Sequence, residues 1–116
     1  MLAAALLSPA LVRWLRAFAF TQLVEIPIYR RTLGAGFWEA FGASAITHPI
    51  VWFGFFSPYA PGTYLQRSIA AELFAWLVEA AYFRARGRRN ALGWALVANG
   101  ASVGLGLLSR SLFGAP

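Results

Sequence analysis

The sequence predicts an all-α polytopic membrane protein with four transmembrane helices arranged as two antiparallel hairpins. Apolar residues make up 59% of the 116 residues. Charged residues make up 12%, against roughly 25% in a typical soluble domain. The apolar residues fall into four runs close to the length of about 20 residues that a span requires. The runs lack the period-2 alternation of barrel strands, so we expect one four-helix transmembrane domain over residues 1–116.

The first hairpin is expected to hold helices over residues 9–29 and 37–56. Ser8 can cap the first helix, and Pro9 fits its first turn, where the missing N–H would be unpaired in any case. Two arginines follow the first helix. The second helix is followed by the Pro/Gly-rich stretch 57–62, which predicts a loop.

The second hairpin is expected to hold helices over residues 64–84 and 91–108. Thr63 and Gln66 have the spacing of a capping box, which predicts the start of the third helix. A short basic turn follows that helix. Asn90 is then expected to cap the fourth helix.

Arginine distribution predicts the topology. The two loops expected on one side, 30–34 and 84–89, hold more arginines than the other side, which favours placing them in the cytoplasm. Arginine without lysine suggests a GC-rich coding bias, and we expect a bacterial cytoplasmic membrane. The net charge of +6 does not indicate nucleic-acid binding, because the arginines sit at the ends of apolar runs and not on one basic face. The six arginines of the basic side are Arg30, Arg31, Arg84, Arg86, Arg88 and Arg89.

A possible internal repeat relates the two hairpins. The tripeptide Leu-Val-Glu occurs at 23–25 and again at 77–79, an offset of 54 residues. At the same offset, His48 aligns with Ser102. Two hairpins in one orientation would be related by an axis along the membrane normal. Coincidence in an Ala/Leu/Arg-rich sequence is the alternative.

Polar residues within the apolar runs are the candidate functional residues. An ionisable group at membrane depth costs at least about 2.5–3.5 kcal/mol, so such groups face the bundle interior. Two carboxylates brought together in a low dielectric cannot both ionise easily, and a nearby histidine titrates near neutral pH. The predicted binding or proton-relay residues are Glu25, His48, Glu79, Asn99, Gln22, Thr47 and Glu72.

Structural roles compete with this interpretation. Polar side chains also hold transmembrane helices together, at about 0.6 kcal/mol each. Glu25 and Glu79 would then pair with the arginines at the ends of their helices by snorkelling. We interpret Glu39 as structural, because it lies in the first turn of a helix, where the helix dipole favours a carboxylate. Pro49 leaves the carbonyl of Ala45 without a helical donor.

The fourth helix carries two ladders of small residues, Gly100-x-x-x-Gly104 and Ala98-Ser102-Gly106. Small residues at this spacing allow close helix packing, either inside the monomer or in a homo-oligomer. Trp76 lies between the two glutamates of the third helix and is expected to line a cavity.

These observations leave three functions open. The first is a proton-coupled small-solute carrier or channel-like protein, oligomeric because four helices enclose little volume. The second is a non-catalytic subunit or assembly factor of a larger membrane complex. The third is an intramembrane acid–base enzyme, which is ranked last because no nucleophile or cofactor motif accompanies the carboxylates. With no cysteine and one histidine, neither a metal site nor another cofactor is expected. The expected partners are the lipid bilayer and either further copies or a larger membrane complex.

Overall fold

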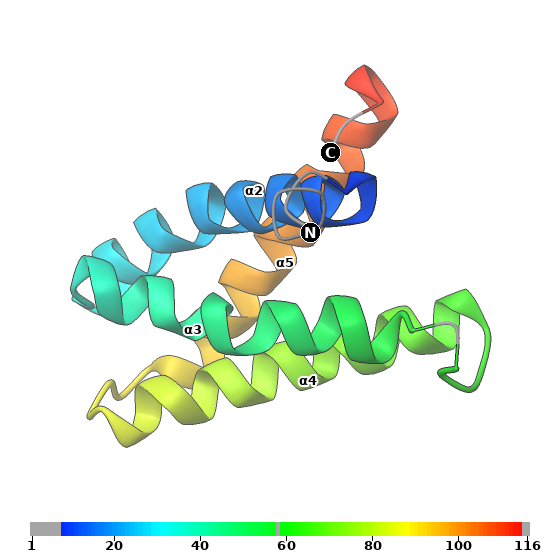
Figure 1. Ribbon diagram of the computed structural model, residues 1–116. Coiled ribbons are helices and arrows are strands. Elements are labelled where there is room, and N and C mark those ends of the chain that lie inside the picture. Colours follow the sequence, from blue (N-terminus) through cyan, green and yellow to red (C-terminus); the bar gives the residue numbers. More distant parts are fainter. Residues whose placement is uncertain (1–7, 58, 115–116) are drawn as a thin grey trace.

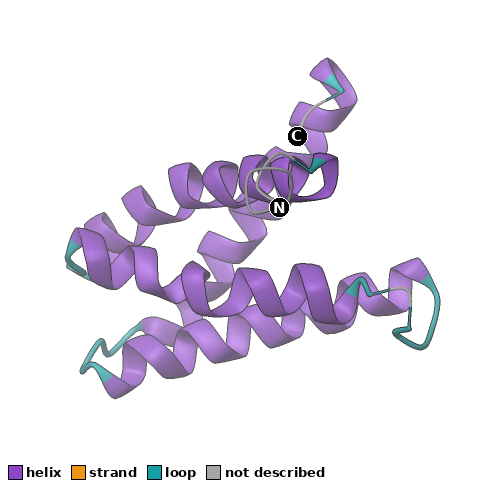
Figure 2. Cartoon of the chain, in the orientation of Figure 1, coloured by secondary structure: helices purple, strands orange, loops and turns teal. Residues whose placement is uncertain are grey.

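The computed structural model describes residues 8–57 and 59–114, and this part of the chain is all-helical. It contains four α-helices and one short π-helical segment, with no strand among the described residues (Figure 2). The elements are α2 (Pro9–Thr32), α3 (Phe37–Ile50), η1 (Val51–Phe55), α4 (Tyr64–Ala85) and α5 (Ala91–Phe113). The predicted helical class is therefore confirmed.

The helices form a closed ring. Each helix packs against the next one along the chain, and α5 returns to pack against α2. In Figure 1, α2, α3 and α4 run roughly side by side, while α5 crosses behind them at an oblique angle. The α2–α3 and α4–α5 turns lie at one end of the bundle, and the α3–α4 loop lies at the other (Figure 1). The two predicted basic loops are thus neighbours in space.

Two of the three predicted helix caps are confirmed. The Oγ of Ser8 accepts a hydrogen bond from the Leu11 N–H at 3.2 Å. Thr63 and Gln66 form the reciprocal capping box, with bonds of 3.1 and 2.9 Å. The prediction for Asn90 is wrong, because its side chain makes no cap bond. Its backbone, with φ −95° and ψ 28°, does not adopt the extended conformation usual for an N-cap.

The first and last helices of the described chain, α2 and α5, are longer than expected. Helix α2 continues past 29 to Thr32, and α5 continues past 108 to Phe113. Arginine and serine lower the local hydropathy near these ends, but they do not interrupt helical hydrogen bonding. The helix α5 ends where Gly114 takes a positive φ of 70° and its N–H bonds the carbonyl of Arg110, as in an αL cap.

The second predicted helix is not one continuous α-helix. Its α-helical part ends at Ile50, and η1 follows with π-type spacing. The N–H of Phe56 bonds the carbonyl of Val51 at 3.3 Å, five residues earlier. Pro49 lies two residues before this segment and supplies no N–H, which loosens the α-helical register there. Pro27, in contrast, lies within the unbroken α2.

The distribution of side chains is the reverse of that in a soluble bundle. The buried apolar residues are alanines together with Tyr29 and Phe83, and no leucine, isoleucine or valine in the described part is buried. Polar residues fill the rest of the interior. The buried polar residues are Gln22, Glu25, Ser44, Thr47, Glu79 and Asn99. Large apolar side chains instead cover the outside of all four helices.

One helix meets a simple criterion for a membrane span. Within residues 8–57 and 59–114, only α5 is both long enough and apolar enough to cross a bilayer. That criterion uses length and hydropathy alone, and a core helix of a soluble protein can also pass it. It supports one span weakly and does not confirm the predicted set of four.

Candidate functional site

Two carboxyl groups meet at the centre of the bundle. Glu25 comes from α2 and Glu79 from α4, and each residue is only 1% exposed. Ser102 donates to Glu25 and also to the carbonyl of Asn99, whose side-chain amide donates to Glu79. The two carboxyl groups thus belong to one buried network and interact electrostatically. The predicted convergence of these two glutamates on one site is therefore seen in the structure.

The Glu79 carboxylate is surrounded by donors from three helices. Its Oε1 accepts hydrogen bonds from the Tyr29 hydroxyl at 2.6 Å and from the Asn99 amide at 3.3 Å. Its Oε2 accepts a bond from the Thr47 hydroxyl at 2.7 Å. Since α2, α3 and α5 each contribute one of these donors, this single side chain links α4 to every other helix.

The Glu25 carboxylate is held by two hydroxyl groups. Its Oε1 accepts a hydrogen bond from Ser44 on α3 at 2.7 Å. Its Oε2 accepts one from Ser102 on α5 at 2.8 Å. All five donors around the two carboxylates are neutral.

The donors are arranged with approximate two-fold symmetry. Each carboxylate receives one bond from the next helix of its own hairpin, through Ser44 or Asn99. Each receives another from the second helix of the other hairpin, through Ser102 or Thr47. The matching donors in α3 and α5 are 55 residues apart, one more than the glutamates. Ser102 therefore corresponds to Thr47 in its contacts, and its predicted alignment with His48 is shifted by one residue.

Neither buried carboxylate is neutralised by an arginine. Within the described residues, the ion pairs are made by Glu39 and not by Glu25 or Glu79. The alternative that these glutamates snorkel to arginines at the ends of their helices is thus not what the structure shows. Two buried negative charges in contact repel strongly, so neutral donors alone favour a pair that shares one proton.

His48 lies outside this centre. Its ring packs among Trp14, Phe18 and Trp52, at centroid distances of 6.3, 5.4 and 6.2 Å. Its Nδ1 is buried and has no hydrogen-bond partner among the described residues. The neighbouring residue, Thr47, is the one that reaches the carboxylates, because successive residues of a helix point about 100° apart.

The two remaining predicted site residues lie elsewhere. The Gln22 amide donates to the carbonyl of Phe41 at 3.1 Å and joins α2 to α3. Glu72 lines a groove of about 510 Å³ between α4 and α5, together with Ser68, Trp76 and Asn99. The groove therefore reaches the polar centre through Asn99, which also contacts Glu79.

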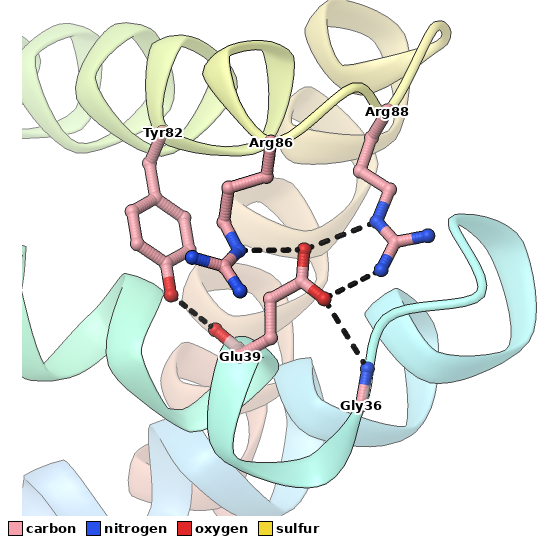
Figure 3. A network of polar contacts seen from close by, with 5 residues as sticks. All are labelled: Gly36, Glu39, Tyr82, Arg86 and Arg88. Carbon is pink, nitrogen blue, oxygen red and sulfur yellow. Dashed lines mark hydrogen bonds and ion pairs between the residues drawn. The ribbon is translucent and has the colours of Figure 1, made fainter.

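Glu39 forms a separate network at the end of the bundle that carries the basic turns (Figure 3). Its carboxylate accepts from the Nε of Arg86 and of Arg88, each at 3.0 Å, and from the Gly36 N–H at 3.4 Å. The hydroxyl of Tyr82 donates to its carbonyl at 2.9 Å. Hydrogen bonding to Glu39 raises the pKa of Arg88. These contacts fasten the start of α3 to the α4–α5 turn, which is a structural role.

Three residues of the polar centre were not among the predicted site residues. Tyr29 lies one helical turn after Glu25, on the same face of α2, and Ser44 lies three residues before Thr47. Ser102 lies three residues after Asn99. Helical spacing from the predicted residues is the pattern that identifies all three.

Comparisons with known proteins give no relative. No protein-family model, curated protein or solved structure matches this chain significantly. The function must therefore be inferred from the chemistry of the site.

Proposed function

We propose that the chain is an integral membrane protein whose four helices all span the bilayer. The helices contain 24, 22 and 23 residues, and α3 with η1 adds 14 and 5. At about 1.5 Å per residue, these lengths suit a hydrocarbon core about 30 Å thick. The apolar exterior and polar interior support the same placement, since lipid solvates leucine where water would not. Only 22% of the apolar window of α5 is buried, whereas a soluble core helix would be mostly buried.

We infer a topology with the two basic turns in the cytoplasm. They lie at the same end of the bundle (Figure 1), as two like-oriented hairpins require. The matched donors of the two carboxylates support an internal repeat about an axis along the membrane normal.

The function that this site supports best is that of a small proton-coupled carrier. The supporting observation is that the Glu25 and Glu79 carboxyl groups lie buried in one hydrogen-bond network, have only neutral donors and form no ion pair with any described residue. Such a pair gains or loses a proton at little cost in structure, since hydroxyl donors can rotate. Proton release on one side and uptake on the other would drive solute movement. A path for the solute would form between copies, because four helices enclose little volume.

A flux experiment tests this proposal. Purified protein is placed in liposomes containing a pH-sensitive dye, and a pH gradient is imposed. We expect proton flux that is lost in the E25Q/E79Q variant and kept in E39Q, the matched glutamate change outside the pair. Equal flux in the wild type and in E25Q/E79Q would exclude this role.

A second candidate, a subunit of a larger membrane assembly, is favoured by the outer face of α5. An added Cβ at Gly100 or Gly104 would meet no atom within 4 Å, so this ladder is open. The ladder Ala98-Ser102-Gly106 faces the bundle instead. Ala98 is buried, and a Cβ at Gly106 would lie 3.7 Å from Phe20. Co-purification of a partner at fixed stoichiometry in mild detergent would support this candidate, and a self-contained homo-oligomer would count against it.

A further inference from the structure

We propose that the groove between α4 and α5 binds a lipophilic organic cation, with Glu72 holding the positive charge. This inference rests on the proposed carrier function and names its substrate class. The groove volume of about 510 Å³ lies within the roughly 300–1,000 Å³ typical of small-molecule sites.

The charge of the groove selects cations. Glu72 is the only charged residue among those that line it, although the chain as a whole carries a net charge of +6. Its carboxylate has no hydrogen bond or ion pair to another described residue, in contrast to Glu39 with its two arginines. A half-buried carboxylate without an ion-pair partner gains from a cationic ligand.

The walls of the groove select a lipophilic cation over a metal ion. They are built from aliphatic side chains, including Ile69, Leu73 and Leu96, and from the ring of Trp76. The indole N–H of Trp76 donates to the carbonyl of Leu92 at 2.8 Å, which fixes the ring, and tryptophan is the best aromatic partner for a cation. No group of three or more His, Cys, Asp or Glu able to hold a metal is found within the described residues.

The groove is connected to the proton-sharing pair. Asn99 lines the groove and donates to Glu79 at 3.3 Å. Glu72 also repels Glu79 electrostatically. The titratable groups near Glu72 are therefore Glu79 on its own helix and, beyond it, Glu25 and Tyr29 on α2, while α5 contributes only neutral groups. A cation bound at Glu72 removes this repulsion and favours proton release from the pair, and linkage makes the effect reciprocal.

Binding of tetraphenylphosphonium to the purified protein in neutral detergent tests the proposal. Wild type, E72Q, E72D and E39Q are compared, with triphenylphosphine oxide as an uncharged probe of similar shape. We expect E72Q to bind the cation at least roughly tenfold more weakly, because contacts to a charged group are worth about that much. We expect E72D and E39Q to bind within a few-fold of wild type, and the uncharged probe to bind weakly to all four. Since Glu72 forms no hydrogen bond, E72Q should fold normally.

Unchanged affinity in E72Q, or equal binding of the uncharged probe, would overturn the proposal. A wild-type dimer that covers this groove and binds no cation would also overturn it. Proton release on cation binding distinguishes the two proposals. If the wild type binds the cation through Glu72 but releases no more protons than E25Q/E79Q, the carrier proposal fails and the groove site stands.

Discussion

At the scale of the residue, the two buried glutamates differ in how many hydrogen bonds each carboxylate accepts. Glu79 accepts hydrogen bonds from Tyr29, Thr47 and Asn99, whereas Glu25 accepts them from two serines. A buried donor that loses its acceptor costs about 1–3 kcal/mol. The stability of the bundle should therefore depend more on Glu79 than on Glu25.

Replacement of Glu79 by leucine tests this difference. Glu79→Leu removes three hydrogen bonds and should lower the free energy of unfolding by more than Glu25→Leu, which removes two. The expected loss is about 1–3 kcal/mol in each case, because Thr47, Asn99 and Ser102 each keep a bond to a backbone carbonyl. Denaturant unfolding in mixed micelles measures both. Glu72→Gln is the control and should change stability by no more than about 0.5 kcal/mol, because it removes no hydrogen bond. Equal stabilities of E79L and wild type would contradict this account.

Tyr29 allows a single hydrogen bond to be removed without loss of packing. Its hydroxyl bonds Glu79, while its ring packs on Phe83 at a centroid distance of 4.3 Å. Tyr29→Phe keeps the ring contact and leaves the Oε1 of Glu79 one donor, from Asn99. We expect a loss of about 1 kcal/mol in unfolding free energy. A loss as large as that of Glu79→Leu would show that the ring, and not the hydroxyl, is being disturbed.

The sequence predicted most of this polar centre, because buried polar groups in an apolar helix must face inward. Glu25, Glu79, Thr47 and Asn99 follow from that rule. His48 obeys the same rule but points into an aromatic cluster. Adjacent residues of a helix face different neighbours, and helical spacing alone does not show which neighbour is polar.

At the scale of the element, α3 and α4 approach closely at Gly42. A Cβ at this position would lie 2.7 Å from the Tyr82 hydroxyl, which donates to the carbonyl of Glu39. The absence of a side chain at Gly42 therefore permits this bond.

Gly42→Ala should displace the Tyr82 hydroxyl and cost about 1 kcal/mol, the worth of one hydrogen bond. In a Tyr82→Phe background, the same change should cost clearly less, since the clashing oxygen is absent. Thermal unfolding of the four variants of this cycle provides the test. Additive effects would contradict the proposed contact.

The residues around each helix start predicted where a helix begins better than the sequence predicted where a helix is interrupted. Ser8 and the Thr63/Gln66 capping box form the predicted hydrogen bonds, because capping depends on residues within one turn. The backbone conformation at Asn90 and the π-helical segment after Pro49 depend instead on how the neighbouring helices pack against one another. Such tertiary demands do not appear in the spacing of apolar residues.

At the scale of the whole molecule, the Glu39 network joins distant parts of the chain. Glu39 lies in the first turn of α3, and Arg88 lies 49 residues later, in the α4–α5 turn (Figure 3). No local pattern predicts this pairing, although hydropathy predicts the helices α3 and α4 that it connects.

A double-mutant cycle of Glu39→Gln and Arg88→Gln should reveal a small favourable coupling. The coupling should shrink as salt is raised, because Arg88 is partly exposed to solvent and its charge is screened there. Unfolding at low and high salt gives the two values. A coupling that is independent of salt would indicate packing instead of charge.

The central claim is that Glu25 and Glu79 share a proton inside the bundle. Infrared spectroscopy of the protein in lipid, at neutral pH, observes the carbonyl stretch of a protonated carboxyl group directly. We expect this band in E72Q, which removes the other unpaired carboxyl group, and its loss in the E25Q/E72Q/E79Q triple variant. A spectrum of E25Q/E72Q/E79Q identical to that of E72Q would contradict the claim.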